Sequence, residues 1–209
     1  MKYTHILWDF NGTILDDIQT GIDCANILLE KHGLKTIPDR DYYQKVFGFP
    51  IIKYYERLGF DFTKEDYHTV AVEWVDLYLK ECVKAPVNIG VTDTLERIKK
   101  LGIPQYILSA TECDMLKGQL AQLDISDYFT EILGLDNIHA GSKTHLGEEW
   151  YNRVKPKKAL LIGDTTHDYE TACRMGIDCI LYSGGHMNRV TLEKCGCRII
   201  DSFDELCFE

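Results

Sequence analysis

Four stretches of the chain hold side chains that could do chemistry together. In WDFNGTILDD (residues 8–17), Asp9 directly follows an apolar run. Ser109 ends the run YIL, and Lys143 stands just before a helical pattern. Asp164 and Asp168 begin and end the stretch DTTHD. These side chains supply a carboxylate nucleophile, carboxylates for a metal, a hydroxyl donor and one cation. Phosphoryl transfer uses such a set, because it depends on positioning and on neutralising charge.

Each of these residues alone also has an ordinary structural explanation. Asp9, Ser109 and Asp164 could each cap a helix or a turn. Lys143 could be a solvated lysine, because most charged side chains lie at the surface. Their shared position favours the functional interpretation, since all four lie at the ends of apolar runs or in the loops that follow. Ligands bind there in open parallel sheets, beyond the carboxyl ends of the strands.

The segments that must position these residues alternate between strand and helix patterns. Short apolar, β-rich runs predict buried strands at 4–8, 105–108, 159–162, 179–182 and, more weakly, 197–200. Helical spacing between them predicts helices at 92–102 and 168–175, the second ended by Gly176. This alternation predicts an α/β fold with a parallel sheet.

The segment between the first two strands has a different pattern. Residues 18–32 and 64–82 show helical spacing, and no stretch from 17 to 84 is a convincing strand. Gly48, Pro50 and Gly59 divide the segment into short helices. We therefore predict a small all-helical domain, residues 16–85, inserted after the first strand of a core domain formed by residues 1–15 and 86–209.

The composition restricts the partners and the compartment. The 209 residues carry a formal net charge of -10, which disfavours nucleic acid and anionic membranes as partners. The start MKYTHILWDF lacks the signal-peptide pattern, and no apolar run reaches about 18 residues. We expect a cytoplasmic protein whose eight scattered cysteines are reduced thiols. The pattern does not decide between a monomer and a small homo-oligomer.

The motifs resemble those of the haloacid dehalogenase superfamily, in the phosphatase branch related to phosphoglycolate phosphatase and β-phosphoglucomutase. The first family motif, DxDGT[LV], corresponds to DFNGTI at 9–14, and the fourth, GDxxxD, to GDTTHD at 163–168. Ser109 matches the second motif and Lys143 the third, which lies 34 residues after Ser109 and 21 before Asp164. The resemblance implies a Rossmann-like parallel core with an inserted helical cap.

The resemblance also implies roles for individual residues. Asp9 is expected to be the nucleophile that takes the phosphoryl group as an aspartyl phosphate. The expected cofactor is Mg²⁺, which suits oxygen ligands. Its ligands would be Asp9, the backbone carbonyl of Asn11 and Asp164, with Asp168 acting directly or through water. Lys143 would neutralise charge on Asp9 and on the phosphate.

The phosphoryl oxygens and the substrate have expected partners as well. Ser109 and the backbone amides near Asn11, Gly12 and Ala110 are expected to hold phosphoryl oxygens, and Thr13 belongs to the same loop. The cap loop FGFP (47–50), with Gly48, resembles a family loop near the substrate. The implied partner is a small-molecule phosphate ester, because a closing cap leaves little room for a protein.

Asn11 departs from the family motif, which has a second aspartate at this position as the general acid/base. An amide does not titrate in the useful range. Metal and phosphate binding should survive, while general acid–base catalysis, worth about 10²–10⁴-fold, is expected to suffer at this position. Other polar residues lie near the site by sequence, and each is more typical of a cap, a hinge or a solvated side chain: Asp16, Asp17, Glu112, His167 and His186.

Three alternatives stay open at this level. A dehalogenase of the same superfamily needs no metal, and the Asp164 and Asp168 pair argues against it. A phosphonate hydrolase would need a cap lysine for a Schiff base, and Lys53 or Lys64 would have to serve. A catalytically weak phosphate-binding or regulatory protein would explain Asn11, because binding parts of a site can outlast its acid/base.

Overall fold

The computed structural model describes residues 2–136 and 142–208. Within these residues the chain forms a six-stranded sheet in which every neighbouring pair is parallel. The strands are β1 (His5–Trp8), β2 (Gln105–Glu112), β3 (Glu131–Leu135), β4 (Ala159–Gly163), β5 (Asp178–Tyr182) and β6 (Arg198–Ile200). Their order is β3-β2-β1-β4-β5-β6, so the chain winds outward from β1 in both directions. This confirms the predicted α/β fold with a Rossmann-like parallel sheet.

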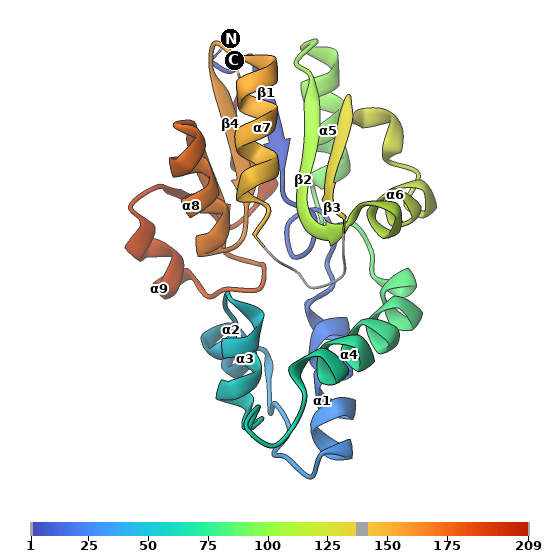
Figure 1. Cartoon of the computed structure of the whole chain (residues 1–209). Helices are drawn as coiled ribbons and strands as arrows, with labels where there is room; N and C mark the ends of the chain where they lie inside the picture. Colours follow the sequence, from blue (N-terminus) through green and yellow to red (C-terminus); the bar gives the residue numbers. More distant parts are fainter. Residues whose placement is uncertain (1, 137–141, 209) are drawn as a thin grey trace.

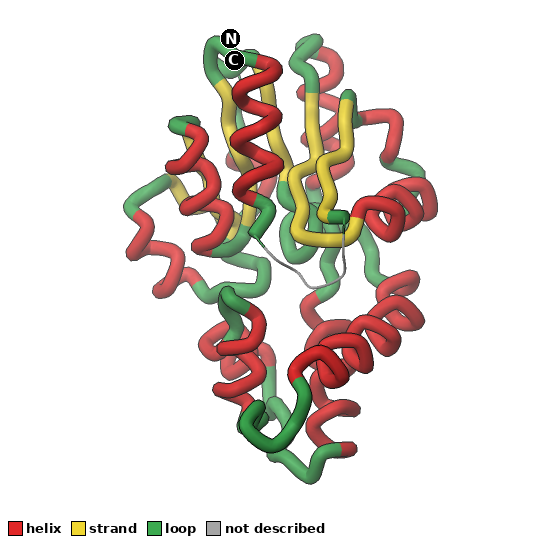
Figure 2. Tube along the Cα trace, viewed as in Figure 1, coloured by secondary structure: helices red, strands yellow, loops and turns green. Residues whose placement is uncertain are grey.

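Helices cover both faces of this sheet and form a separate layer beyond one end of it (Figures 1 and 2). The α-helices are α1 (Ile18–Lys31), α2 (Arg40–Val46), α3 (Ile51–Leu58), α4 (Tyr67–Glu81), α5 (Val91–Lys100), α6 (Cys113–Gln122), α7 (Thr144–Val154), α8 (Thr166–Met175) and α9 (Arg189–Leu192). Short 3₁₀ turns are η1 (Cys82–Lys84), η2 (Ser126–Tyr128), η3 (Glu193–Cys195) and η4 (Phe203–Glu205).

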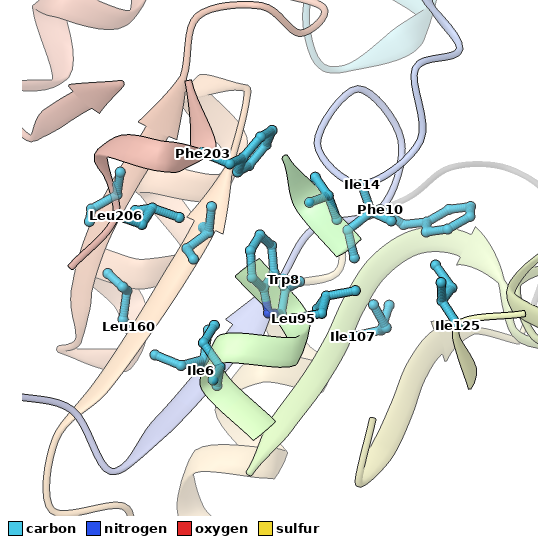
Figure 3. Close-up of a cluster of buried hydrophobic side chains, with 14 of the residues drawn as sticks. Ile6, Trp8, Phe10, Ile14, Leu95, Ile107, Ile125, Leu160, Phe203 and Leu206 are labelled. Atoms are coloured by element: carbon cyan, nitrogen blue, oxygen red, sulfur yellow. The ribbon is translucent and has the colours of Figure 1, made fainter. Parts of the chain in front are cut away.

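Alternating side chains of β1 build two different cores. Ile6 and Trp8 point to one face, where they join Leu95 of α5 and Phe203 of η4 in the main hydrophobic cluster (Figure 3). Leu7 points to the other face and packs among residues of β2, β4, α7 and α8. A strand covered on both faces reads as a continuous apolar run. That is why β1, β2 and β4 were recognisable in the sequence.

Two strands differ from the sequence prediction. β2 does not end at Ser109 but runs on to Glu112, with a register shift against β3 between Leu108 and Glu112. β3 was not predicted at all. It lies at the edge of the sheet, and only Leu135 of its residues is fully buried. An edge strand with a half-buried face lacks the continuous apolar run that identified the central strands.

The segment between β1 and α5 is helical, as the sequence predicted. Helices α1 to α4 share their own hydrophobic cluster, which includes Leu28, Tyr43, Tyr55 and Val70. They lie beyond the carboxyl ends of the strands, away from the two chain termini (Figure 1). The chain leaves and re-enters the core side by side, because Leu15 bridges Val87 and the Asp16 amide donates to the Pro86 carbonyl.

We propose that the boundary between two domains lies where the chain leaves and re-enters the core. It agrees with the predicted division at residues 15/16 and 85/86, and the helical part is called the cap below. In the part of the chain that the structure describes, no helix has both the length and the apolar character needed to cross a bilayer.

Candidate active site

The central strands bring three of the expected residues to one edge of the sheet. Asp9 follows β1, and its amide donates to the Ile162 carbonyl of the neighbouring β4 over 2.8 Å. Ser109 lies on β2, on the other side of β1, and Asp164 directly follows β4. The strand order reverses at β1, which is where ligands bind in open parallel sheets.

Lys143 joins this group from the start of α7. Its ammonium pairs with Asp9 Oδ1 and lies 2.6 Å from Asp168 Oδ1, and the side chain is almost completely buried. Burial disfavours the charged form, but the carboxylates of Asp168 and Asp9 raise the pKa of Lys143 above its ordinary value. The lysine is therefore a fixed cation at the site and not the solvated surface residue that was its ordinary alternative.

Asp9, Asp164 and Asp168 together could hold a metal ion. One carboxylate oxygen from each lies within 4.8 Å of the other two, and all three residues are buried. Burial raises the pKa of Asp9 and of Asp164. Three carboxylates face the single ammonium of Lys143, so the cluster has surplus negative charge that a divalent cation would balance. Hard oxygen donors of this kind fit Mg²⁺.

Local hydrogen bonds fix these carboxylates. Asp168 Oδ2 accepts from the amides of Asp164 and Thr165 and from Thr165 Oγ1, at 3.2, 2.9 and 2.7 Å. This arrangement caps the first turn of α8 while Oδ1 stays directed at Lys143. Thr13 Oγ1 lies 3.3 Å from Asp9 Oδ2 and 3.1 Å from Asp164 Oδ1. Thr13, expected near the substrate, thus links two carboxylates of the cluster.

Gly12 has a conformational reason to be glycine. Its φ is +74°, and a Cβ there would lie 2.3 Å from Asp164 Oδ2 and 2.5 Å from His186 Cδ2. Its amide already donates to the Asp17 carboxylate at 2.8 Å and to the Leu15 carbonyl at 2.9 Å. In this conformation the amide is therefore occupied, and Gly12 contributes a tight turn beneath the carboxylates.

Asn11 is held by hydrogen bonds on both ends of its amide. Its Nδ2 donates to Asp17 Oδ2 at 2.9 Å and to the Tyr78 hydroxyl at 2.7 Å. Its Oδ1 accepts from Thr111 Oγ1 at 2.7 Å. The Tyr78 hydroxyl also donates to Asp17 Oδ2 at 2.6 Å. An asparagine therefore suits position 11, because its amide can donate a hydrogen bond to the neighbouring Asp17 carboxylate.

Asp17 and His186 form a buried ion pair next to Asn11, with His186 Nε2 3.4 Å from Asp17 Oδ1. His186 Nδ1 lies 2.7 Å from the Tyr43 hydroxyl, and its amide donates to Asp164 Oδ2 at 2.6 Å. Although burial opposes both charges, Asp17 raises the pKa of His186 to about 9. The charge of His186, with hydrogen bonds from His186, Tyr78 and Asn11, lowers the pKa of Asp17.

This pair corrects the sequence interpretation of both residues. Asp17 stands at the N-terminus of α1, but its side chain makes no capping bond there. Glu112 does cap a helix, since its carboxylate accepts from the Asp114 and Met115 amides at the start of α6. A sequence shows which residues can cap, but not which carboxylate the tertiary fold turns inward.

Ser109 is buried, and its Oγ accepts from the Thr111 amide at 3.1 Å. Among the residues that the structure describes, the Ser109 hydroxyl hydrogen has no acceptor, so it can donate to a bound group. Ser109 and Ala110 line a pocket of about 170 Å³ that also reaches Asp9, Asn11 and Lys143. The polar cluster thus forms one end of this pocket.

The cap loop supplies aromatic rings to the pocket. Phe47 and Phe49 line it, with Phe47 stacked on His186 and Phe49 on His167 at ring distances of 4.8 Å. Gly48 lies between them but is turned away, toward Arg57 and Met187. The residues of this loop that face the pocket are therefore its two phenylalanines and not Gly48.

The cap lysines do not support a phosphonate hydrolase. The side chain of Lys53 is 58% exposed and pairs with Glu56, and that of Lys64 is 78% exposed and pairs with Asp61. Neither is among the residues that line the pocket. A Schiff-base lysine needs a buried setting, and both of these side chains are exposed.

Three residues of the site had no signal in the sequence: Tyr43, Tyr78 and Thr111. The two tyrosines come from α2 and α4 of the cap and reach Asn11 and the Asp17–His186 pair only in the folded chain. Thr111 lies two residues beyond Ser109, where β2 was expected to have ended. The prolongation of β2 through a register shift places it opposite Asn11.

Known proteins share sequence and fold with this chain. A family model described as haloacid dehalogenase-like hydrolase matches residues 6–182. The chain is 28% identical over 200 residues to a phosphoglycolate phosphatase of Aquifex aeolicus, covering 87% of this chain and 85% of that protein. It is 24% identical over 194 residues to one of Synechococcus elongatus, with 90% and 87% covered.

A solved structure shares the fold over nearly the whole chain. A haloacid dehalogenase-like family protein from Streptococcus pneumoniae has a TM-score of 0.83 and 20% sequence identity, over 98% of this chain and 96% of that one. The match of the family model spans β1 to β5, the strands that carry Asp9, Ser109 and Asp164. The chain therefore belongs to the haloacid dehalogenase-like hydrolase family.

Proposed function

We propose that the protein is a Mg²⁺-dependent phosphomonoester hydrolase that works through an aspartyl phosphate on Asp9. One observation carries the proposal. Asp9 lies at the end of a pocket, paired with the buried ammonium of Lys143 and within 4.8 Å of Asp164 and Asp168. The relatives named phosphoglycolate phosphatase support the same reaction class.

The side chains divide the reaction between them. A carboxylate oxygen of Asp9 attacks phosphorus, the bond from phosphorus to the ester oxygen breaks, and the ester oxygen leaves. Ser109 donates its hydroxyl to a phosphoryl oxygen, and Lys143 compensates the charge on Asp9 and the phosphate. Water then attacks phosphorus and releases inorganic phosphate and the Asp9 carboxylate. Asp9, Asp164 and the Asn11 carbonyl, supported by Asp168, would hold Mg²⁺, which would supply further charge neutralisation at the phosphate.

Asn11 limits which esters react well. Its amide cannot give a proton to the departing oxygen, and hydrogen bonds with Asp17, Tyr78 and Thr111 hold it in place. The departing oxygen must then leave as an anion or take a proton from water. General acid catalysis is worth about 10²–10⁴-fold, so esters of acidic alcohols should react far faster than esters of ordinary alcohols.

The test is hydrolysis of 4-nitrophenyl phosphate with and without Mg²⁺ by the natural chain, Asp9→Asn and Asn11→Asp. Turnover by the natural chain that requires Mg²⁺ and disappears in Asp9→Asn is the expected result. Asp9→Asn keeps the shape of the side chain, so circular dichroism should show an unchanged fold. Turnover that survives in Asp9→Asn would exclude the covalent route.

Asn11 favours a second candidate, a phosphate-binding protein with negligible turnover. In that case the natural chain binds orthovanadate and Mg²⁺ but hydrolyses no ester, and only Asn11→Asp turns over. Titration calorimetry with Mg²⁺ and vanadate, run beside the kinetic assay, separates the two candidates.

A further inference from the structure

We propose that the substrate is a monophosphate ester of a phenol with a single uncharged aromatic ring. The inference rests on the proposed phosphatase function and deepens it by naming the substrate class. It separates this chain from relatives named for phosphoglycolate, whose substrate carries a second anionic group.

The part of the pocket beyond Asp9 is an aromatic and aliphatic wall supplied by the cap. Trp74 and Tyr78 of α4 stack with their rings 4.8 Å apart. Phe49, Tyr67 and Val75 line the same pocket. Aromatic walls bind planar rings by stacking and by burying apolar surface.

The cap gives this pocket no positive charge. Among the described residues that line it, none from the cap is a lysine, arginine or histidine. Two basic side chains of the cap have partners outside the pocket lining: Arg57 donates to the Val46 carbonyl, and Lys31 pairs with Glu73. The charged cap residue in the described lining is Asp17, whose carboxylate pairs with His186 and offers an anion no partner. A carboxylate or second phosphate on the leaving group would therefore lose its solvation without gaining a partner.

The cations on the core side are already paired. Lys143 is bound to Asp9 and Asp168, and His186 to Asp17. His167 stacks on the Phe49 ring, and its Nε2 lies 3.1 Å from Ser142 Oγ. These groups lie at the phosphate end of the pocket. The part lined by the cap therefore suits an uncharged leaving group.

The size of the pocket agrees with one ring. Its volume is about 170 Å³, and an apolar protein cavity of roughly 150 Å³ accommodates benzene. This volume also includes the phosphate end beside Asp9, so it leaves room for no more than one ring, and a peptide or a nucleotide exceeds it.

Asn11 points to the same class from an independent direction. A site without a proton donor at this position favours a leaving group that departs easily as an anion. Phenols ionise at about pH 10, so a phenolate leaves far more readily than the alkoxide of an ordinary alcohol. Both the wall of the pocket and the chemistry at Asn11 thus select a phenolic ester.

The experiment compares phenyl phosphate, benzyl phosphate and 2-phosphoglycolate with Mg²⁺. Phenyl and benzyl phosphate share the ring, while benzyl phosphate and 2-phosphoglycolate share an ordinary alcohol as leaving group. We expect KM for both ring substrates to be at least about tenfold below that for 2-phosphoglycolate, and kcat to be highest for phenyl phosphate. A KM for 2-phosphoglycolate equal to or below those of the ring substrates would overturn the proposal.

Variants of the cap test the wall itself. Trp74→Ala and Phe49→Ala should each raise KM for phenyl phosphate about five- to tenfold. Tyr42→Ala is the matched control, because Tyr42 is an exposed aromatic of the same cap outside the pocket. Val75→Lys should lower KM for 2-phosphoglycolate by supplying the missing cation. Unchanged KM values in all three pocket variants, each shown to be folded, would contradict the proposal.

Binding of unreactive analogues keeps this inference separate from the proposed function. Calorimetry with Mg²⁺ should show that phenylphosphonate binds at least about tenfold more tightly than 3-phosphonopropionate. That result without turnover of any ester would reject the hydrolase and retain the ligand class. Equal binding of the two phosphonates would reject the ligand class, whatever the rates of hydrolysis.

Discussion

Asn11 and Asp17 are complementary at the level of single residues. The amide of Asn11 donates to Asp17 Oδ2, and the charge of His186 keeps Asp17 ionised. An aspartate at position 11 would place a second carboxylate against this oxygen, where a donor is now found. The departure from the family motif therefore has a structural partner six residues along the chain.

We predict that Asn11→Asp lowers stability and that Asn11→Asp with Asp17→Asn restores most of the loss. Two carboxylates in contact in a buried site disfavour each other, and breaking a buried charged hydrogen bond costs about 1–3 kcal/mol. Urea unfolding at pH 7.5 of the natural chain, both single variants and the double variant gives the coupling free energy. If the two single changes simply add, Asn11 and Asp17 are not a matched pair.

Sequence reasoning reached some of these residues and missed others for a physical reason. Asp9 and Asp164 follow buried apolar strands, and a local pattern of that kind is visible in the sequence. The contacts of Asn11 with Tyr78 and Thr111 join residues 67 and 100 positions apart. Nothing in their local surroundings distinguishes them from other polar residues of helices and strands.

Among the elements, α8 links a helix terminus to the reactive cluster. The carboxylate of Asp168 caps the helix with one oxygen and holds Lys143 with the other. The loss of a capping contact is thus transmitted to the ammonium beside Asp9. Within the described residues, the Asp66 cap of α4 has no such link to the reactive cluster, so it provides a comparison.

We predict that Thr165→Val lowers both stability and kcat, whereas Thr69→Val lowers stability alone. Each threonine donates its hydroxyl to a capping aspartate, Asp168 at 2.7 Å and Asp66 at 2.8 Å. Removing such a capping contact costs about 1 kcal/mol. Only Thr165 holds a carboxylate that contacts Lys143. Thermal unfolding and 4-nitrophenyl phosphate kinetics of both variants test this, and equal kcat values in the two would contradict it.

The strands show where sequence patterns stop being informative. β1 and β4 are covered on both faces and were predicted nearly to the residue. β3 is an edge strand with mostly half-buried side chains, and its pattern did not stand out. The extension of β2 beyond Ser109 depends on pairing with β3, so a missed edge strand also hid Thr111.

At the scale of the whole molecule, the loop after β5 attaches the cap to the core. Arg40 and Gln44 of α2 donate to the carbonyls of Gly184 and Gly185, and Tyr43 contacts His186. The pocket lies between the two parts and takes its lining from both. The sequence predicted a cap and a core. The packing of the cap against the core depends on long-range contacts that neither segment encodes alone.

The ion pair of His186 makes this attachment dependent on pH. Asp17 raises the pKa of His186 from 6.5 to about 9 on folding. A group whose pKa is higher in the folded state stabilises the fold fully below its unfolded value and loses this effect as pH rises through the folded value. The stabilisation should therefore be complete below about pH 6.5 and decline toward pH 9 and above.

We predict that the free energy of unfolding falls by up to about 3 kcal/mol between pH 6.5 and 9.5, from about 1.36 kcal/mol per pKa unit. His186→Gln should show a flatter profile over this range, because glutamine keeps hydrogen-bonding capacity but has no charge to lose. Chemical unfolding of both proteins at several pH values measures the difference, which also cancels the titration of cysteines and other shared groups. Parallel profiles would show that His186 is neutral in the folded protein, and that Asp17 is stabilised by Asn11 and Tyr78 without an imidazolium partner.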